Sequence, residues 1–251
     1  MPLLDHFHLP LSASHPWMGF HSTWATAMAQ QLNGDLLPDD HYAIPNVQLG
    51  GQIEIDVATL KNGERDDGSR GDRVAADPPG GVATAVWAPP RPAIAEPVDF
   101  GHLDLFEVQV LRDFGGPQLR AAVELVSPGN KDRPGQRRAF AIKCASYLQR
   151  GVSVVVVDVV TERAADLHAL LMETLQLAGV SAWRSASGLY AVAYRTAAAA
   201  DGQDRLEAWP ETLRLAEPLP TVPLWLGPDL CLPLDLEASY TAARESLRIR
   251  G

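Results

Sequence analysis

The chain has 251 residues, of which 46% are hydrophobic and 21% are charged, a composition typical of a soluble globular protein. Its formal net charge of −10 argues against indiscriminate nucleic-acid binding, because the average field repels phosphate groups. The N-terminus lacks the basic start and apolar core of a signal peptide, and no apolar run reaches the length of a membrane span.

The two cysteines predict a reducing compartment. Cys144 and Cys231 lie far apart, and neither has a neighbour at metal-ligand spacing. Because the sequence also shows no targeting or membrane segment, we expect a cytoplasmic protein that does not enter a membrane.

The first predicted elements are a helix and a strand. Apolar residues recur at helical spacing over 20–32, and the Asn-Gly pair that follows is a typical helix end. The segment over 47–60, "VQLGGQIEIDVATL", alternates between apolar and polar residues. This alternation predicts a strand in which Asp56 lies on the face opposite to Ile55 and Val57.

Two irregular segments follow this strand. Residues 61–81 are polar and rich in glycine, which predicts a mobile insertion outside the core. Residues 87–100 are rich in proline and predict an extended connector. Residues 103–113 and 119–127 then predict an antiparallel pair of strands joined by a short Gly-Gly-Pro turn.

A helix and a buried strand are predicted next. The helix lies over 134–150, with Pro134 near its first turn and Gly151 just past its end. The run "VSVVVVDVV" over 152–160 is continuously apolar, which predicts a central strand covered on both faces. Since a helix connects it to the strand over 119–127, we expect these two strands to pair in parallel.

The C-terminal third predicts a helix over 162–179, a strand over 188–195 and a proline-rich crossing over 218–251 that contains a helix from about Leu234. Since no second complete core is evident, we expect one domain spanning residues 1–251. It would consist of a mixed sheet with helices on its faces, an α/β fold.

One segment is strongly basic despite the acidic average. Residues 129–150 contain six cations and one acid, a local net charge of +5, which leaves −15 for the remainder. The cations are Lys131, Arg133, Arg137, Arg138, Lys143 and Arg150. If the protein binds nucleic acid, we expect the phosphates to approach through Lys131, Arg133, Arg137 and Arg138.

Two acids in candidate neighbouring strands suggest a metal site. Side chains that share a face on adjacent strands stand about 5 Å apart, so Asp56 and Glu124 together fit one Mg²⁺ or Mn²⁺. Such a metal activates water for attack on a phosphodiester, and Lys131 and Lys143 are the lysines available beside it. The alternatives are that Glu124 is a core acid neutralised by an arginine and that Asp56 and Lys143 face solvent.

The order of these motifs resembles a known superfamily. The segments "IDVATL", "VELVSPGNK", "KCASYLQRGV" and "VVVVD" are similar to the PD-(D/E)XK restriction-endonuclease-like proteins, in the branch whose lysine has moved to the following helix. Over nearly its whole length, including "HPWMGFHSTWATAMAQQLN" and "VPLWLGPDLCLPLDLEASY", the chain resembles the family known as domain of unknown function 4058. The resemblance implies an α/β/α sandwich around a mixed central sheet, the restriction-endonuclease-like fold.

The resemblance also implies a set of site residues. Asp56 takes the place of the motif aspartate, Glu124 that of the acid in the E-x-K strand motif, and Lys143 that of the helix lysine. The chain departs from the pattern at Ile55, where proline would stand, and at Val126, where the strand lysine would stand.

Three functions are compatible with this pattern. The first is a metal-dependent nuclease in which Asp56 and Glu124 hold Mg²⁺ or Mn²⁺ and Lys143 stabilises charge. The second is a non-catalytic nucleic-acid or protein-binding module on a degenerate nuclease scaffold, and the third is a structural partner in a larger assembly. Convergence of Asp56, Glu124 and Lys143 within about 4–6 Å would favour the enzyme, because one metal has to reach both carboxylates.

Overall fold

A computed structural model of the chain describes residues 2–49, 53–61, 87–98, 118–177, 183–198 and 203–250, without the side chains of residues 35, 46–49 and 53–56. The expected insertion beyond Lys61 and the expected strand over 103–113 lie outside the described residues. In the part of the chain that is described, no helix is long and apolar enough to cross a membrane.

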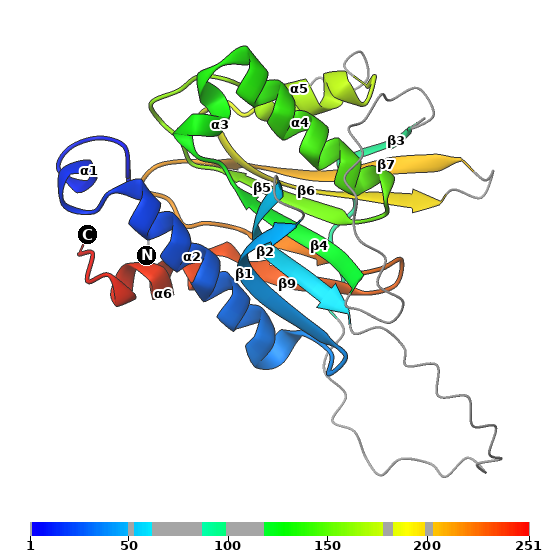
Figure 1. The fold of residues 1–251 in the computed structure, drawn as a ribbon, viewed down its shortest axis with the longest axis horizontal. Coiled ribbons are helices and arrows are strands. Elements are labelled where there is room, and N and C mark those ends of the chain that lie inside the picture. The colour runs from blue at the N-terminus through cyan, green and yellow to red at the C-terminus, as the bar shows by residue number, and fades with distance from the viewer. Residues whose placement is uncertain are drawn as a thin grey trace, which may run out of the picture.

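The described strands form a mixed sheet with the order β1-β2-β4-β5-β6-β7-β3 (Figure 1). The strands are β1 (His41–Leu49), β2 (Ile53–Lys61), β3 (Ile94–Pro97), β4 (Gln118–Leu125), β5 (Ser153–Asp158), β6 (Leu189–Ala198) and β7 (Asp204–Leu213). Of these pairings, β4 with β5 is parallel and the others are antiparallel. A separate hairpin consists of β8 (Thr221–Trp225) and β9 (Cys231–Asp235).

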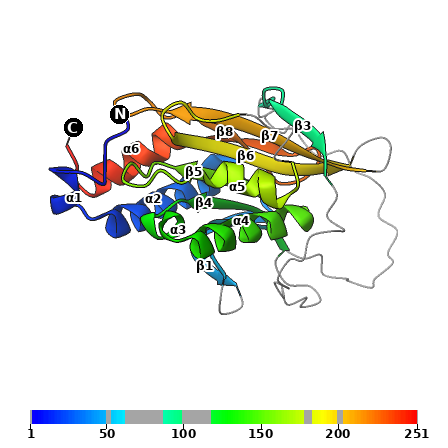
Figure 2. The same ribbon diagram turned by 90° about the horizontal axis from the view of Figure 1, so that it is seen from above.

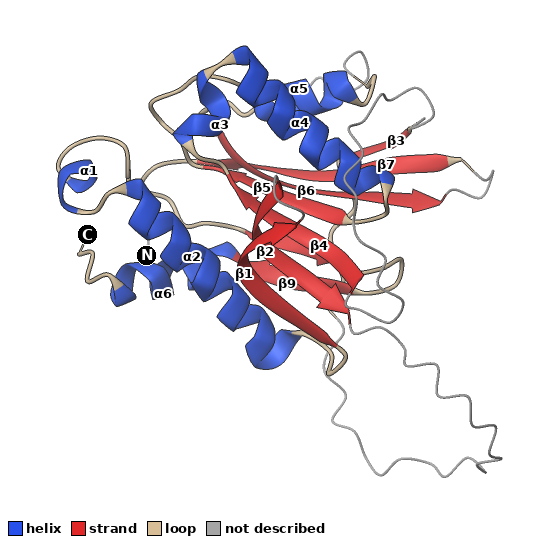
Figure 3. Cartoon of the chain, in the orientation of Figure 1, coloured by secondary structure: helices blue, strands red, loops and turns tan. Residues whose placement is uncertain are grey.

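Helices cover both faces of the sheet, which makes the fold a mixed α/β structure (Figure 3). The helical elements are α1 (Leu11–Ser14), α2 (Trp17–Gln31), η1 (Leu32–Leu36), α3 (Pro128–Asp132), α4 (Pro134–Gln149), α5 (Leu167–Thr174) and α6 (Leu236–Ser246). On one face, α4 and α5 pack over the sheet, while α2, α6 and the β8–β9 hairpin contribute to the apolar cluster of the other face.

The strand β5 is central and fully buried, as its continuous apolar sequence predicts. All six of its residues are buried, and it has three strands of the sheet on each side. Val155 and Val157 belong to the cluster beneath α2, whereas Val154 and Val156 belong to the cluster beneath α4. This alternation requires apolar residues at every position, because neither face of the strand meets water.

The unit from β4 through α4 to β5 also follows the sequence prediction. The helix α4 begins at Pro134 and ends in a left-handed turn at Gly151, whose φ is +71°. There the N–H of Val152 donates to the carbonyl of Tyr147, and the N–H of Gly151 donates to that of Leu148. This pair of bonds is the Schellman ending that glycine favours. It turns the chain directly into β5, which pairs in parallel with β4.

Several of the described strands were not anticipated: β3, β7, the hairpin of β8 and β9, and the division of the segment over 47–60 between β1 and β2. The predicted connector over 87–100 contains β3, which pairs with β7 at the edge of the sheet, and β7 itself carries no regular apolar alternation. Prolines obscure both strands in the sequence, yet each proline lies where the sheet tolerates it. Pro97 belongs to the edge strand, and Pro210 lies past the last residue of β7 that β3 contacts, Ala208.

The two ends of the described chain lie close together (Figure 2). Leu3 exchanges main-chain hydrogen bonds with Ala216 and Glu217, and the Arg244 guanidinium of α6 donates to the Pro2 carbonyl. The N-terminal segment is therefore tied to residues more than 200 positions away, which closes the cluster beneath α2 and α6.

Candidate functional site

Two lysines of the crossover between β4 and β5 reach two acids on the same face of the sheet. Lys143 of α4 contacts Glu124 of β4, and Lys131 of α3 contacts Asp158 at the end of β5. Glu124 lies opposite Val156 in the register of β4 and β5, and Asp158 follows Val156 by two residues. From the spacing of strands and residues, the Cα atoms of the two acids are roughly 8 Å apart.

The pair formed by Glu124 and Lys143 is close and partly open to solvent. Lys143 Nζ donates to Glu124 Oε2 at 2.6 Å, and the exposed fractions of the two side chains are 20% and 3% respectively. The ammonium group also stands 5.3 Å from the centroid of the Phe140 ring, which lies one turn earlier on α4. A solute can therefore reach the lysine, while the carboxylate is held below it in the sheet.

The backbone of β2 brings position 56 close to Glu124 of β4. The strand β2 pairs antiparallel with β4, and the last pair in register is Val57 with Val123. Continuing that register by one residue sets position 56 across from Glu124. The side chain of Asp56 lies outside the described part of the structure.

Val126 stands at the strand position where the resemblance would have a lysine. The Val126 side chain is fully buried in the apolar cluster beneath α4, and its N–H donates to the Val157 carbonyl at 2.9 Å. A lysine at this position would place its charge in that cluster at a large desolvation cost. The helix α4 instead delivers Lys143 to Glu124 from above the sheet.

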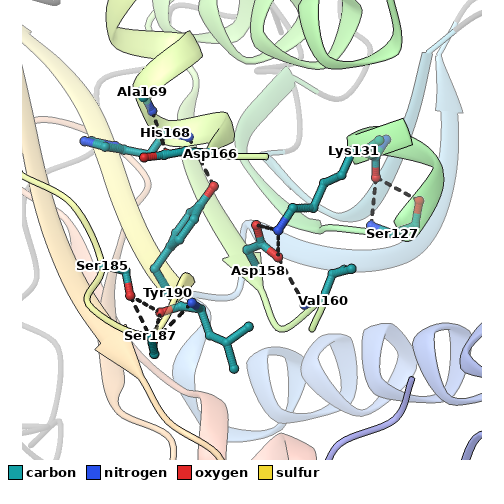
Figure 4. A network of polar contacts seen from close by, with 12 residues as sticks. Ser127, Lys131, Asp158, Val160, Asp166, His168, Ala169, Ser185, Ser187 and Tyr190 are labelled. Atoms are coloured by element: carbon teal, nitrogen blue, oxygen red, sulfur yellow. Dashed lines mark hydrogen bonds and ion pairs between the residues drawn. The ribbon is translucent and has the colours of Figure 1, made fainter. Parts of the chain in front are cut away.

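The second pair, Lys131 with Asp158, is drawn in Figure 4, and its two side chains are sealed from solvent. Lys131 Nζ stands 2.9 Å from Asp158 Oδ2 and 3.2 Å from Oδ1, and the two side chains are 1% and 0% exposed. The N–H of Val160 donates to the same carboxylate at 3.1 Å. Burial raises the pKa of Asp158 to about 6, although Lys131 and hydrogen bonds from Val160 and Tyr190 pull it downward.

A short capped turn brings Lys131 to this position. Ser127 precedes α3 and forms a capping box with Asn130, whose side-chain oxygen accepts from the Ser127 N–H at 2.8 Å. Pro128 occupies the first turn, where its missing N–H costs nothing. The segment "SPGNK" is thus a turn that leads into the helix, as expected, and it also inserts a cation into the core.

The expectation that Lys131 belongs to a phosphate-binding surface is wrong. The charge pattern placed it with three arginines on an exposed basic face, but its ammonium group is buried and bound to Asp158. Burial of the lysine is possible because the acid at the end of β5 neutralises it. The Arg133, Arg137 and Arg138 side chains remain at least partly exposed at the start of α4.

A buried histidine adjoins the sealed pair and was not anticipated. His168 of α5 has its Nδ1 atom 2.7 Å from the Tyr194 hydroxyl, and its main-chain N–H donates to the Tyr190 hydroxyl at 3.1 Å. Burial lowers the pKa of His168 to about 4, so the ring is neutral at physiological pH. The sequence held one signal of this network: a charged Asp158 at the end of a fully apolar strand requires a buried partner.

The described residues contain no complete metal site. No group of three or more His, Cys, Asp or Glu side chains converges within the described ranges. The Glu124 carboxylate has the chemistry that Mg²⁺ and Mn²⁺ prefer, and position 56 of the neighbouring strand carries a second carboxylate. The arrangement can neutralise an anion through Lys143 and share Glu124 with a hard cation.

Comparisons with known proteins add no relative to this description, since no family model, no curated protein and no solved structure matches the chain.

Proposed function

We propose that the protein is a Mg²⁺- or Mn²⁺-dependent nuclease on a restriction-endonuclease-like fold. Asp56 and Glu124 are the proposed metal ligands, and Lys143 is the proposed charge-stabilising group. The observation that carries the proposal is the contact of 2.6 Å between Lys143 and Glu124, made across α4 and β4. The two residues are 19 positions apart and meet in the arrangement that the shifted-lysine resemblance implies.

The backbone register supports a role for Asp56. Position 56 continues the pairing of β2 with β4 to the residue across from Glu124. Opposed residues on adjacent strands carry Cβ atoms about 5 Å apart, a separation over which two carboxylates bind one hard cation.

The residues divide the chemistry between them. A divalent cation supplies an activated water and neutralises charge on the phosphodiester when it is bound. Glu124 holds its carboxylate in the sheet, where the strand fixes its position. Lys143 faces solvent in part and stabilises the negative charge that develops on the phosphate oxygens in the transition state.

A cluster of arginines beside these residues favours the approach of nucleic acid. Arg133, Arg137 and Arg138 gather at the start of α4, five residues or more before Lys143, and the side chain of Arg133 is 83% exposed. Cations at a helix N-terminus oppose the helix dipole, so this cluster does not serve the stability of α4. It supplies the positive potential that phosphates require on a protein of net charge −10.

The first test measures cleavage of DNA and RNA with Mg²⁺ or Mn²⁺ present. We expect Lys143→Met to keep substrate affinity and to lose at least about 100-fold in rate, because the lysine acts on transition-state charge. Lys61→Met is the matched control, a partly exposed lysine of β2 paired with Asp40. An absence of cleavage by the wild-type protein on every substrate would refute the enzymatic proposal.

The metal is tested separately by calorimetric titration with Mn²⁺. We expect the wild-type protein to bind Mn²⁺ and Glu124→Gln to bind it much more weakly, since the variant lacks one of the two anionic ligands. Equal heats from the two proteins would remove Glu124 from the metal site.

A non-catalytic binding module is the second candidate, and two observations favour it. Lys143 already neutralises Glu124, and the strand position of the motif lysine is the buried Val126. This candidate predicts salt-sensitive nucleic-acid binding without cleavage. Arg137→Glu with Arg138→Glu should weaken that binding equally for all sequences, because backbone contacts carry no base information, whereas the exposed control Arg248→Glu should not.

A further inference from the structure

A cavity of about 630 Å³ opens where β5 ends, apart from Glu124 and Lys143. Three segments line it: residues 160–166 between β5 and α5, residues 185–190 at the start of β6, and residues 214–215 after β7. Small-molecule sites commonly have volumes of about 300–1,000 Å³. In open α/β sheets they lie beyond the carboxyl ends of strands, which is where this cavity lies.

Two arginines from different segments line the cavity. Arg163 pairs with Asp132 at 2.6 Å, and Arg214 pairs with Glu217 at 3.4 Å. All four side chains are between 41% and 55% exposed, and exposed ion pairs of this kind contribute little to stability. Both guanidinium groups are therefore available to an anionic ligand at small cost.

The carboxylate among the lining residues is already committed. Asp166 precedes α5, and its Oδ1 atom accepts from the Ala169 N–H at 2.8 Å. Its Oδ2 atom pairs with Arg184 at 3.2 Å. Because Arg184 pairs with Asp166, the charge of this carboxylate is compensated from outside the set of lining residues.

The rest of the wall combines apolar side chains with hydroxyl groups. Val160, Leu189 and Leu215 contribute carbon surface, and Leu215 is 41% exposed. The hydroxyl of Ser185 donates to the Leu189 carbonyl, and the neighbouring serine of the same turn is likewise bonded to the main chain. A ligand that covers Leu215 would remove apolar surface from water.

We propose that this cavity binds a small organic phosphate monoester, with the phosphate between Arg163 and Arg214 and the organic part against Leu189 and Leu215. A phosphate dianion matches two guanidinium groups, each of which binds its oxygens through paired N–H donors. A carboxylate has only two oxygens and one charge, so it offers less to two guanidinium groups than a phosphate dianion with three terminal oxygens. The site is independent of the proposed nuclease chemistry, since neither Glu124 nor Lys143 lines it.

The test is calorimetric titration of the full chain, without divalent cations, with adenosine monophosphate, adenosine and inorganic phosphate. We expect adenosine monophosphate to bind saturably with a Kd below about 1 mM and each fragment to bind at least about ten-fold more weakly. No saturable binding of the nucleotide overturns the proposal. Equal binding of adenosine overturns the role of the phosphate, and equal binding of inorganic phosphate overturns the role of the apolar wall.

Variants of the lining arginines test whether adenosine monophosphate binds in this cavity. Arg163→Gln and Arg214→Gln should each weaken the affinity for adenosine monophosphate by roughly ten-fold or more, the usual effect of losing a charge-assisted hydrogen bond. Arg150→Gln, an exposed arginine at the far end of α4, should leave the affinity unchanged. Glu124→Gln should also leave it unchanged, which separates this site from the proposed metal site. Unchanged affinity in both arginine variants overturns the assignment.

Discussion

Two lysine–carboxylate pairs lie side by side on one face of the sheet and differ chiefly in their access to water. Lys131 and Asp158 are both sealed, whereas Lys143 keeps a fifth of its side-chain surface exposed above the buried Glu124. Both lysines come from the same crossover between β4 and β5. The contrast teaches that sequence spacing alone does not assign a role to such a pair, and that burial of the cation does.

The sealed pair of Lys131 and Asp158 has a structural role. Moving both ions from water into the core is costly, and their attraction offsets that cost only when the geometry is good. Here Lys131 contacts both carboxylate oxygens, and the main chain of Val160 adds a third bond to Asp158. The pair fixes α3 against the end of β5 and thereby fixes the start of α4, which carries Lys143.

Removing one member of the sealed pair should have the largest effect on stability. Lys131→Met and Asp158→Asn should each lower the free energy of unfolding by about 3–5 kcal/mol, because each leaves an uncompensated polar or charged group in the core. Denaturant titration at neutral pH measures the loss. The double variant should recover most of it, since no isolated ion remains. A loss below about 1 kcal/mol in both single variants would contradict the structural role.

The sealed region should also give the protein a pH dependence through His168. Its pKa is about 4 in the folded state and 6.5 when unfolded, so the unfolded chain binds the proton first as pH falls. The contribution of His168 to stability is complete above about pH 6.5 and is lost progressively down to about pH 4. At pH 5 it amounts to a loss of about 2 kcal/mol relative to pH 7.

We expect His168→Gln to show a decrease in unfolding free energy between pH 7 and pH 5 that is about 2 kcal/mol smaller than that of the wild type. The comparison isolates His168, because the contributions of Asp158 and the buried His6 to the pH dependence are present in both proteins. Denaturant titrations at the two pH values measure the difference. Identical pH dependence of the two proteins would show that His168 does not titrate in this way.

The partly exposed pair of Glu124 and Lys143 should tolerate the loss of its carboxylate charge. Glu124→Gln should lower the free energy of unfolding by about 1 kcal/mol or less, because the partly exposed Lys143 ammonium can turn to water when residue 124 carries no charge. Denaturant titration beside Asp158→Asn gives the direct comparison. A loss as large as that of Asp158→Asn would mean that both pairs are structural and would weaken the proposed role of Glu124.

Much of the fold could be predicted from local sequence. The apolar run over 152–160 identified a central strand, since only a strand covered on both faces needs apolar residues throughout. Pro134 and Gly151 set the ends of α4, because each has a backbone preference that is independent of the rest of the chain. A strand, a helix and a second strand in succession then implied the parallel pairing of β4 with β5.

The partners within the sheet could not be predicted in the same way. The sequence suggested that β4 pairs with the segment just before it, but among the described residues its antiparallel partner is β2, more than 50 positions earlier. The β3 and β7 strands were missed because prolines interrupt their patterns. Pairing depends on which edges meet in the folded chain, and local periodicity carries no record of that meeting.

For the candidate site, the sequence by itself determined which residue types are present and on which elements they lie: an acid in β4, a lysine on the following helix, and an acid at the end of β5. The tertiary structure alone decided that Lys143 reaches Glu124 and that Lys131 turns inward to Asp158. The physical reason is that the cost of an ion depends on the water around it. That water is set by the packing of α3 and α4 over the sheet, and no spacing of residues along the chain specifies it.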